Sequence, residues 1–483
     1  MRVLFATSEA APLIKTGGLA DVSGALPPAL RRIGADVRVL LPAYPQVLRA
    51  LANLRLETVF PARFGYPSSR LFEAKTKSGE TLWLLDCPEL YQRNGGPYLD
   101  EHGCDWADNP RRFGLLSKVA AVLSSAESPL DWRPDIVHCH DWQTGLTPAY
   151  LRYLRDPAPC VMTIHNLAFQ GNFHANWVHD LGLPWECFKP EGAEFYGHLS
   201  FLKAGLYYAD RITTVSPSYA REIQGEALGF GMQGLLSHRR NVLSGILNGI
   251  DLEEWNPEKD PNLVQGYTGK TLQRKQANKQ ALRQRTGLQV DENAPLFGMV
   301  SRFTYQKGTD LVLETAHRLM ETPAQLVMLG SGDAALQQQA RELAQRYPGR
   351  VSVTVGFDEG LSHQIEAGAD IFLMPSRFEP CGLNQMYSQR YGTPPIVHAT
   401  GGLIDSVDDF DGSNAETATG FVFGDMHADG LWAAMYRAMQ VYDDKPQWRK
   451  LQENGMRRDF GWENSARAYL AVYKQTLADR SVH

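Results

Sequence analysis

The chain has 483 residues, of which 43% are hydrophobic and 21% are charged, and its formal net charge is −6. This length exceeds one ordinary hydrophobic core and predicts two domains of roughly 200 residues or more. The negative charge argues against a nucleic-acid or membrane-surface partner, because both favour a basic face, and no apolar run approaches the ~20 residues that a membrane span needs.

The N-terminal sequence and the spacing of the cysteines indicate a cytoplasmic protein. Arg2 leads directly into an apolar run that we expect to be the first core strand, which is not the pattern of a signal peptide. The cysteines have no paired short spacing, so we expect reduced thiols at residues 87, 104, 139, 160, 187 and 381. The sequence predicts no particular oligomeric state.

Short β-branched runs alternate with helix-like segments along the chain, the pattern of a mostly parallel sheet with crossover helices. The strands expected in the first half cover residues 3–7, 36–41, 81–86, 135–138, 160–164 and 212–215. Those expected in the second half cover residues 296–301, 324–329, 351–355, 371–374 and 395–397. The fold class is therefore α/β with Rossmann-like lobes.

A domain boundary fits the sequence I-L-N-G-I-D at residues 246–251. The first lobe is then expected over residues 1–246 and the second over residues 247–460. The final segment is amphipathic at helical spacing, so residues 461–483 are expected to form a helix that packs back on the first lobe.

The pattern T-G-G-L-x-D occurs twice, at residues 16–21 and 400–405, each time after an apolar run. Paired glycines between a strand and a helix let backbone N–H groups come close to an anion at the helix N-terminus. Two copies near opposite ends of the chain predict two similar lobes, each aiming a helix end at a shared cleft. Lys15 precedes only the first copy, so the two lobes are expected to differ in chemistry.

Charged residues follow two expected strands of the second lobe, where ligand groups of parallel sheets gather. Arg302 and Lys307 can both neutralise a diphosphate leaving group, although such a pair is also common in solvated loops. Glu379 precedes Pro380 and Gly382, which force a tight entry into the next helix. Its carboxylate can accept sugar hydroxyls or merely complement the helix dipole.

Polar residues also end two expected strands of the first lobe. His165 and Asn166 follow the apolar run 160–164 and can bind a sugar hydroxyl or a developing positive charge, but a histidine there is often only a core residue. The sequence H-C-H-D at residues 138–141 resembles a metal cluster, yet alternation points adjacent side chains to opposite faces and no further ligand lies at a zinc spacing. We therefore predict no metal there and keep Asp141 as a possible cleft carboxylate.

Two further motifs support other functions. Residues 330–335 read G-S-G-D-A-A, which fits a dinucleotide fingerprint and is the main support for an NAD-dependent oxidoreductase. This fingerprint normally follows the first strand of its unit, whereas here it follows the second. The D-F-D at residues 409–411 mimics the D-x-D of metal-dependent sugar transferases, but its Asp/Gly/Ser context favours a solvated turn.

Six blocks together resemble the bacterial glycogen synthase and plant starch synthase family. They are K-T-G-G-L-A-D-V at 15–22, H-D-W at 140–142, H-N-L-A at 165–168, L-N-G-I-D at 247–251, R followed by K-G between 302 and 308, and R-F-E-P-C-G-L at 377–383. The resemblance covers effectively the whole chain and implies a GT-B fold, two Rossmann-like lobes facing a central cleft. It also implies a hexosyltransferase that moves glucose from ADP-glucose, with retention, to an α-1,4-glucan such as glycogen or maltooligosaccharides, without a cofactor or metal.

The resemblance also assigns roles to residues. Those expected to act in catalysis are Lys15, His165, Arg302, Lys307 and Glu379. Those expected to bind the donor are Lys15, Gly17, Gly18, Asp21, Asn248, Arg302, Lys307, Cys381, Gly382, Leu383 and Tyr387. Possible further cleft residues are Asp141, Asn166 and Tyr98.

Two positions depart from the resemblance. Asn384 stands where the family usually has Thr or Ser. Its side chain, which is expected near a donor phosphate, therefore differs in length from that of the family. Tyr387 stands where many retaining enzymes of this fold carry a second Glu, and we expect it to contact the nucleoside. A non-catalytic glucan-binding protein of the same fold is a further alternative, which the intact Lys15 and Glu379 disfavour.

Overall fold

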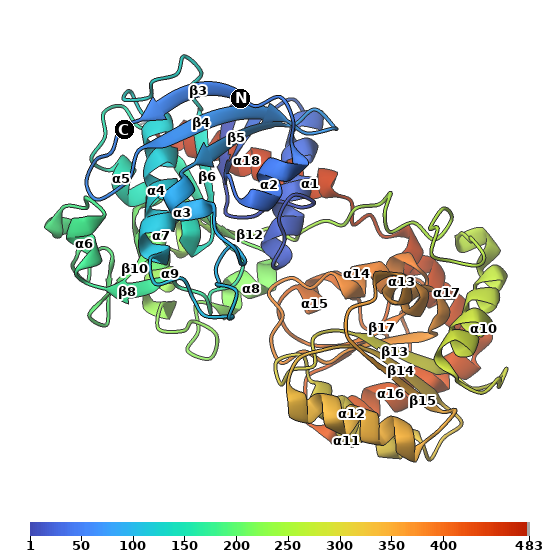
Figure 1. Cartoon of the computed structure of the whole chain (residues 1–483). Helices are drawn as coiled ribbons and strands as arrows, with labels where there is room; N and C mark the ends of the chain where they lie inside the picture. Colours follow the sequence, from blue (N-terminus) through green and yellow to red (C-terminus); the bar gives the residue numbers. More distant parts are fainter. Residues whose placement is uncertain (481–483) are drawn as a thin grey trace. The chain divides into compact units, whose positions relative to one another are not determined.

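The computed structural model describes residues 1–480, which form two compact units (Figure 1). Unit 1 comprises Met1–Gly249 and the C-terminal helix that begins at Trp462, and unit 2 comprises Ile250–Gly461. The first boundary falls after Gly249 rather than after residue 246, so Asn248 belongs to unit 1. The reason is close packing at this joint, because a Cβ on Gly249 would lie 2.7 Å from the backbone of Trp462.

Unit 1 is built on a nine-stranded sheet with the order β12-β11-β7-β6-β1-β2-β5-β4-β3. Its strands are β1 (Arg2–Ala6), β2 (Asp36–Pro42), β3 (Arg55–Phe60), β4 (Ser69–Lys75), β5 (Thr81–Asp86), β6 (Ile136–His140), β7 (Cys160–Ile164), β11 (Arg211–Thr214) and β12 (Leu243–Gly245). All neighbours pair in parallel except the edge strands β3 and β4. The strand order reverses between β1 and β6, and ligands of such sheets bind at this switch point.

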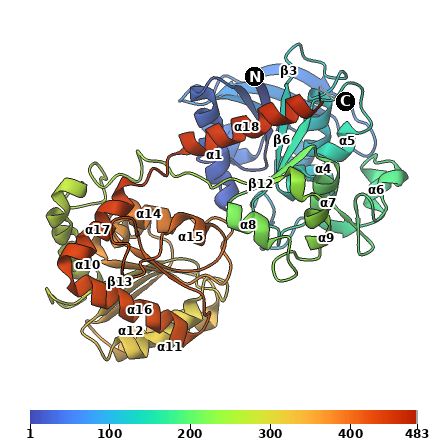
Figure 2. The same ribbon diagram turned by 180° about the vertical axis from the view of Figure 1, so that it is seen from behind.

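Helices cover this sheet, and a three-stranded sheet of β8 (Asn172–His174), β9 (Glu194–Phe195) and β10 (His198–Ser200) accompanies it. The helices are α1 (Gly18–Arg32), α2 (Pro45–Ala50), α3 (Pro88–Tyr91), α4 (Asn109–Leu123), α5 (Thr147–Leu151), α6 (Trp177–Asp180), α7 (Phe201–Tyr208), α8 (Pro217–Glu222), α9 (Gln233–His238) and α18 (Trp462–Arg480). Figures 1 and 2 show α18 lying along α1. The Tyr473 hydroxyl of α18 lies 2.7 Å from Nδ1 of the buried His138, which ties this helix to the sheet.

Unit 2 is built on a six-stranded, fully parallel sheet with the order β15-β14-β13-β16-β17-β18. Its strands are β13 (Leu296–Val300), β14 (Gln325–Gly330), β15 (Val351–Val355), β16 (Ile371–Met374), β17 (Pro395–His398) and β18 (Phe421–Phe423). Its helices are α10 (Lys275–Thr286), α11 (Thr309–Leu319), α12 (Ala334–Arg346), α13 (Glu359–Gly368), α14 (Asn384–Arg390), α15 (Gly401–Ser406), α16 (Ala428–Asp443) and α17 (Lys445–Arg457). This is the 3-2-1-4-5-6 order of a doubly wound sheet, with its switch point between β13 and β16.

Every strand expected from the sequence is present, within two residues at either end. Continuous apolar runs such as Ile371–Met374 are buried along their whole length, because helices cover both faces of a parallel sheet. The unexpected strands include β3 and β4, which form an edge hairpin. Their sequences, R-L-E-T-V-F and S-R-L-F-E-A-K, lack a continuous apolar run, and β3 has no fully buried position.

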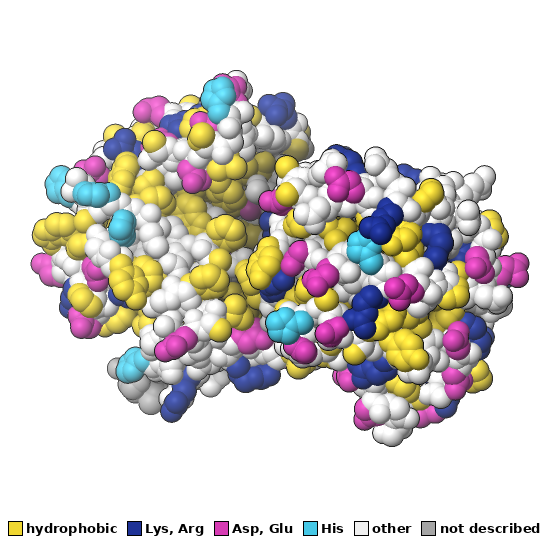
Figure 3. All heavy atoms as spheres, turned by 90° about the horizontal axis from the view of Figure 1, so that it is seen from below, with side chains coloured by type: hydrophobic (Ala, Val, Ile, Leu, Met, Phe, Trp, Pro, Cys, Tyr) yellow, Lys and Arg dark blue, Asp and Glu magenta, His cyan; other side chains and the backbone are white. Residues whose placement is uncertain are grey.

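Among the helices of residues 1–480, none combines the length and the apolar character that crossing a membrane requires. On the face drawn in Figure 3, Lys and Arg side chains are interspersed with Asp and Glu side chains.

Candidate active site

The carboxyl end of β1 brings a buried carboxylate to the first glycine motif. Glu9 is 3% exposed, and its Oε2 accepts hydrogen bonds from the backbone N–H groups of Thr16 (2.5 Å) and Gly17 (3.3 Å). The Tyr98 hydroxyl donates to Oε1 at 2.5 Å. Burial raises the pKa of Glu9, against the effect of these hydrogen bonds. Glu9 therefore fixes the shape of the loop that carries Lys15, a role that the sequence analysis missed.

The glycines of this loop face open space. A Cβ built on Gly17 or on Gly18 would meet no atom within 4 Å. Gly18 is the first residue of α1, so N–H groups of the first turn lack intrahelical partners and can meet an anion. Lys15 pairs with Asp21 at 2.7 Å, and both side chains are accessible, at 56% and 31% exposure.

The second glycine motif has a different use, which corrects the expectation that the glycines of both copies open a helix end to an anion. A Cβ on Gly401 would lie 1.9 Å from the Glu379 carbonyl oxygen, and one on Gly402 would lie 2.0 Å from the Cys381 carbonyl oxygen. The Gly402 N–H donates to the Glu379 carbonyl at 3.1 Å. The absence of side chains at Gly401 and Gly402 therefore lets the start of α15 pack closely against the backbone of the Glu379 segment.

Three histidines form a row at β6 and just after β7, of which His138 and His140 are fully buried and His165 is half-buried. His140 Nδ1 lies 2.9 Å from His165 Nε2, and the rings of His138 and His140 lie 4.0 Å apart. Burial lowers the pKa of His165 to about 3, so its ring is neutral at physiological pH. His140 thereby fixes the ring orientation of His165, which leaves the other ring nitrogen of His165 to meet a ligand.

Asp141 has a local structural role at the end of β6. Its φ is +55°, and its Oδ1 accepts the backbone N–H of His165 at 2.7 Å. Burial raises its pKa from 3.8 to about 7, although hydrogen bonds from the His165 and Asn166 backbone act in the opposite direction. Asp141 thus holds the turn that presents His165 and Asn166.

The raised pKa of Asp141 predicts a pH-dependent stability. The folded state keeps this proton up to about pH 7, whereas the unfolded chain loses it near pH 3.8. The stabilising contribution is therefore fully present below the unfolded pKa and is lost as the pH rises through the folded pKa. Between pH 5 and 7.5, denaturant unfolding should show that the wild type loses about 2–3 kcal/mol relative to Asp141→Asn. Parallel stability curves for the two proteins would contradict this assignment.

The remaining expected residues of unit 1 differ in whether their polar atoms have hydrogen-bond partners. The Asn166 side-chain oxygen accepts the Ala168 N–H at 3.0 Å, and Tyr98 bonds Ser8 Oγ at 2.8 Å in addition to Glu9. Asn248 is 8% exposed, and its Oδ1 has no hydrogen-bond partner within residues 1–480. A buried acceptor without a partner is costly and therefore suits a contact with a ligand hydroxyl or amine.

The switch point of unit 2 brings Arg302, Lys307 and Glu379 together at the ends of β13 and β16. Lys307 Nζ donates to Glu379 Oε2 at 2.6 Å, and the Ser376 hydroxyl donates to the same oxygen at 2.9 Å. The two charged side chains are only 17% and 9% exposed. Arg302 is exposed on the same loop, and its guanidinium makes no ion pair within the described residues. A cation pair and a held carboxylate thus share one edge of the sheet.

A second ion pair locks the two loops of this edge. The Arg377 guanidinium binds the Asp310 carboxylate through two hydrogen bonds of 2.8 Å and lies 3.3 Å from the centre of the Tyr305 ring. Gly308 has a φ of +71°, and a Cβ there would lie 2.1 Å from the Pro375 carbonyl oxygen. The loop of Lys307 can approach the loop of Glu379 only because this residue is glycine.

The start of α14 carries the other expected donor contacts. Cys381 is buried, and Gly382 has a φ of +72°, which turns the chain into the helix that follows Leu383. The Asn384 amide donates to the Val300 carbonyl at 2.7 Å, so this departure from the family pattern ties α14 to the end of β13. Tyr387 stacks on Trp255 with ring centres 3.7 Å apart.

The glycines of the dinucleotide fingerprint allow close backbone packing. A Cβ on Gly330 would lie 1.8 Å from the Ser301 carbonyl oxygen, and one on Gly332 would lie 2.4 Å from that of Phe303. Asp333 caps α12 by accepting the N–H groups of residues 335 and 336, at 2.9 and 3.1 Å. These are the helix N-terminal groups that a pyrophosphate would need, and the carboxylate would also repel it.

The D-x-D sequence forms a structural turn. Asp409 pairs with Arg437 at 2.9 Å, and Asp411 accepts the Ser413 N–H and hydroxyl, each at 2.8 Å.

Both halves of the chain match known protein families. The starch synthase catalytic domain matches residues 2–238, and the glycosyl transferases group 1 family matches residues 280–458. The glycogen synthase of Nitrosomonas europaea is 56% identical over 479 residues, which cover 98% of this chain and 97% of that protein. The chain belongs to the glycogen synthase family.

Other members of the glycogen synthase family and a solved structure agree with this assignment. The glycogen synthase of Dechloromonas aromatica is 54% identical and covers 100% of this chain, with 99% of its own length matched. The catalytic domain of starch synthase IV from Arabidopsis thaliana, bound to ADP and acarbose, is 33% identical with a TM-score of 0.86, covering 99% of each chain. The protein is therefore a glycosyltransferase of the GT-B fold, as the sequence motifs predicted, and the oxidoreductase alternative has no support.

Proposed function

We propose that the enzyme transfers glucose from ADP-glucose to the nonreducing 4-OH of an α-1,4-glucan with retention of configuration. The observation that carries the proposal is the arrangement at the unit 2 switch point, where Lys307 pairs with the held carboxylate of Glu379 and Arg302 is exposed on the loop of Lys307. Cations there suit a diphosphate, and a buried carboxylate suits sugar hydroxyls. The bound ADP and acarbose of the Arabidopsis relative support a nucleoside diphosphate and a glucan as ligands.

Three cations stabilise the leaving group in this proposal. Lys15, Arg302 and Lys307 offset the negative charge that develops as the bond between glucose C1 and the diphosphate breaks. N–H groups in the first turn of α1 and after Gly382 add hydrogen bonds to the phosphates. Asp21 sets the position of Lys15, Asn248 offers its unpaired oxygen to the donor, and Tyr387 contacts the nucleoside.

The sugar is held by Glu379 and His165. Glu379 accepts hydrogen bonds from glucose hydroxyls, and His165 contacts the sugar near the reacting carbon with a neutral ring fixed by His140. We further propose front-face attack, in which the acceptor 4-OH bonds to C1 and its proton passes to the departing phosphate. Asp141 is then a residue that positions the turn, because its Oδ1 already accepts the His165 N–H.

The direct test is transfer of label from ADP-[14C]glucose to glycogen. The proposal predicts label in the washed polymer, ADP released in equal amount, and slower transfer from UDP-glucose at the same concentration. A donor preference for UDP-glucose would overturn the assignment of the donor. Glycogen binding without incorporation of label would point to a non-catalytic glucan-binding protein.

Activity should survive removal of divalent cations. In the proposal Arg302, Lys307 and Lys15 neutralise the diphosphate, so the reaction requires no bound metal ion. Initial rates measured with and without excess EDTA should therefore agree. If EDTA abolished turnover and Mn²⁺ restored it, a metal role for Asp409 and Asp411 would have to be considered again.

A further inference from the structure

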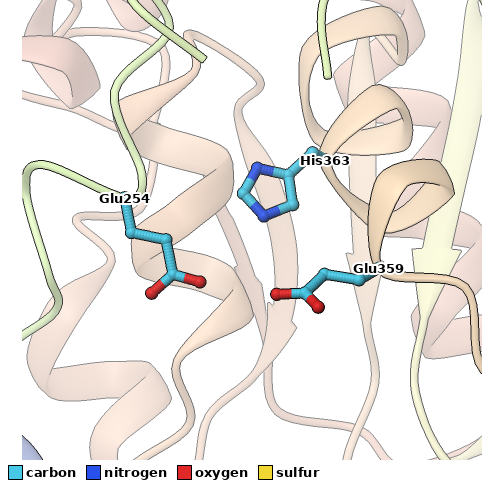
Figure 4. A group of neighbouring side chains, drawn as sticks. All are labelled: Glu254, Glu359 and His363. Carbon is cyan, nitrogen blue, oxygen red and sulfur yellow. The ribbon is translucent and has the colours of Figure 1, made fainter. Parts of the chain in front are cut away.

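A cluster of three potential metal ligands lies in unit 2, apart from the residues of the candidate active site. Glu254, Glu359 and His363 each place one ligand atom within 4.8 Å of the other two. Figure 4 shows both carboxylates and the imidazole ring turned toward one another. Glu359 begins α13 and His363 follows four residues later, so both lie on one face of that helix. Glu254 comes from the segment that follows the entry into unit 2.

His363 is the strongest indication that this cluster binds a ligand. Its side chain is 3% exposed, and its Nδ1 lies 2.7 Å from Asp260 Oδ2. The Tyr391 hydroxyl donates to the same oxygen at 2.6 Å. Asp260 thus accepts the Nδ1 proton of His363, which leaves a lone pair on Nε2.

Nδ1 is the His363 nitrogen that contacts Asp260, so Nε2 is the nitrogen turned toward the two glutamates (Figure 4). The ring cannot turn away, because it stacks on Trp255 with centres 3.9 Å apart and an interplanar angle of 7°. The imidazole therefore presents Nε2 to the space between the two carboxylates. A histidine whose second nitrogen donates to a carboxylate is the usual arrangement of a metal ligand.

We propose that Glu254, Glu359 and His363 bind a divalent cation of the Zn²⁺ class. One imidazole and two carboxylates are ligands that Zn²⁺ accepts, at bond lengths of about 2.0–2.2 Å, with a fourth position for water. Tetrahedral binding brings donors to about 3.4 Å from one another. Both glutamates are exposed, so rotation of their side chains closes the difference from 4.8 Å while the buried imidazole stays in place.

The charges near the cluster favour a cation. Two glutamates and the nearby Asp260 outweigh the weak repulsion from the N-terminus of α13. The ion joins the segment of Glu254 and Trp255 to α13. Trp255 also stacks on Tyr387, so the ion stabilises the ring stack behind the proposed nucleoside contact. The site serves the structure of unit 2 and takes no part in the proposed reaction.

The test is Zn²⁺ binding to the full chain after treatment with EDTA and removal of the chelator. Titration calorimetry should give one site in the wild type. Glu254→Gln and Glu359→Gln should each weaken that site by at least tenfold, and Asp260→Asn by roughly 10–100-fold because the imidazole loses the carboxylate that accepts its Nδ1 proton. Glu314→Gln, an exposed glutamate of α11 in the same unit, is the matched control and should bind Zn²⁺ like the wild type.

Thermal unfolding supplies a second readout that is independent of transfer activity. Zn²⁺ should raise the melting temperature of the wild type and of Glu314→Gln, but not of Glu254→Gln or Glu359→Gln, because a ligand stabilises the state it binds. Equal Zn²⁺ affinity in the wild type and in both cluster variants, or no binding to the wild type, would overturn the proposal. His363 would then be only the buried partner of Asp260.

Discussion

Lys15→Ala should lower kcat/KM for ADP-glucose by about 2–4 kcal/mol in transition-state stabilisation, the size of effect seen when one donor to a developing negative charge is removed. Lys15 lies in the loop that Glu9 fixes through the Thr16 and Gly17 N–H groups, so its backbone is positioned before the donor arrives. Its Asp21 partner is accessible, and so is the ammonium group. The cation can therefore exchange this partner for a phosphate.

Stability measurements separate this role from a structural one. An exposed ion pair contributes roughly 0–1 kcal/mol, so the melting temperature of Lys15→Ala should stay close to that of the wild type. Lys77→Ala, in the exposed turn between β4 and β5, makes the same change of charge and should leave kcat/KM unchanged. Unaltered kinetics in Lys15→Ala would show that Lys15 is only a surface residue.

Glu379→Gln should lower kcat/KM by roughly 10²–10³-fold while the protein still folds. The amide keeps the size of the side chain, but it accepts hydrogen bonds from sugar hydroxyls less strongly than a carboxylate. It also leaves the Lys307 ammonium, 2.6 Å from Glu379 Oε2, without its counter-charge. Some loss of stability is therefore expected together with the loss of rate.

A second buried ion pair provides the control for that loss of stability. Lys279 and Asp370 lie 2.6 Å apart with side-chain exposures of 2% and 13%, and Asp370 precedes β16 at the edge of the sheet opposite Glu379. Asp370→Asn should lower the melting temperature at least as much as Glu379→Gln but leave kcat/KM near normal. If both variants lost only stability, Glu379 would serve only the helix dipole and its ion pair.

The sequence predicted where the site residues lie in the fold better than it predicted which atoms they contact. Arg302, Lys307 and Glu379 could be expected at one edge of unit 2 because each follows an apolar run, and parallel strands end at a common edge. The different uses of the two glycine motifs could not be predicted. Both read T-G-G-L-x-D, yet Gly17 faces open space whereas Gly401 packs on the Glu379 carbonyl. Only the three-dimensional neighbours of a glycine show why it lacks a side chain.

Residues that act through long-range contacts also escaped prediction. Glu9 lies two residues beyond the first expected strand, and its role depends on Tyr98, which is 89 positions away in the sequence. His140 was set aside with a rejected metal cluster, but it contacts His165 across neighbouring strands. A polar residue just after a strand next to the switch point was the one available signal for both.

The most direct test of the account is the chemistry of the first turnovers with ADP-glucose and a maltooligosaccharide. Proton NMR of the product, with ADP release measured in the same sample, reports both the new linkage and its configuration. The account predicts one new α-1,4 linkage at the nonreducing end for each ADP released, at the same rate with and without EDTA. A β-configured product, free glucose in place of a longer glucan, or ADP release without a new linkage would contradict it.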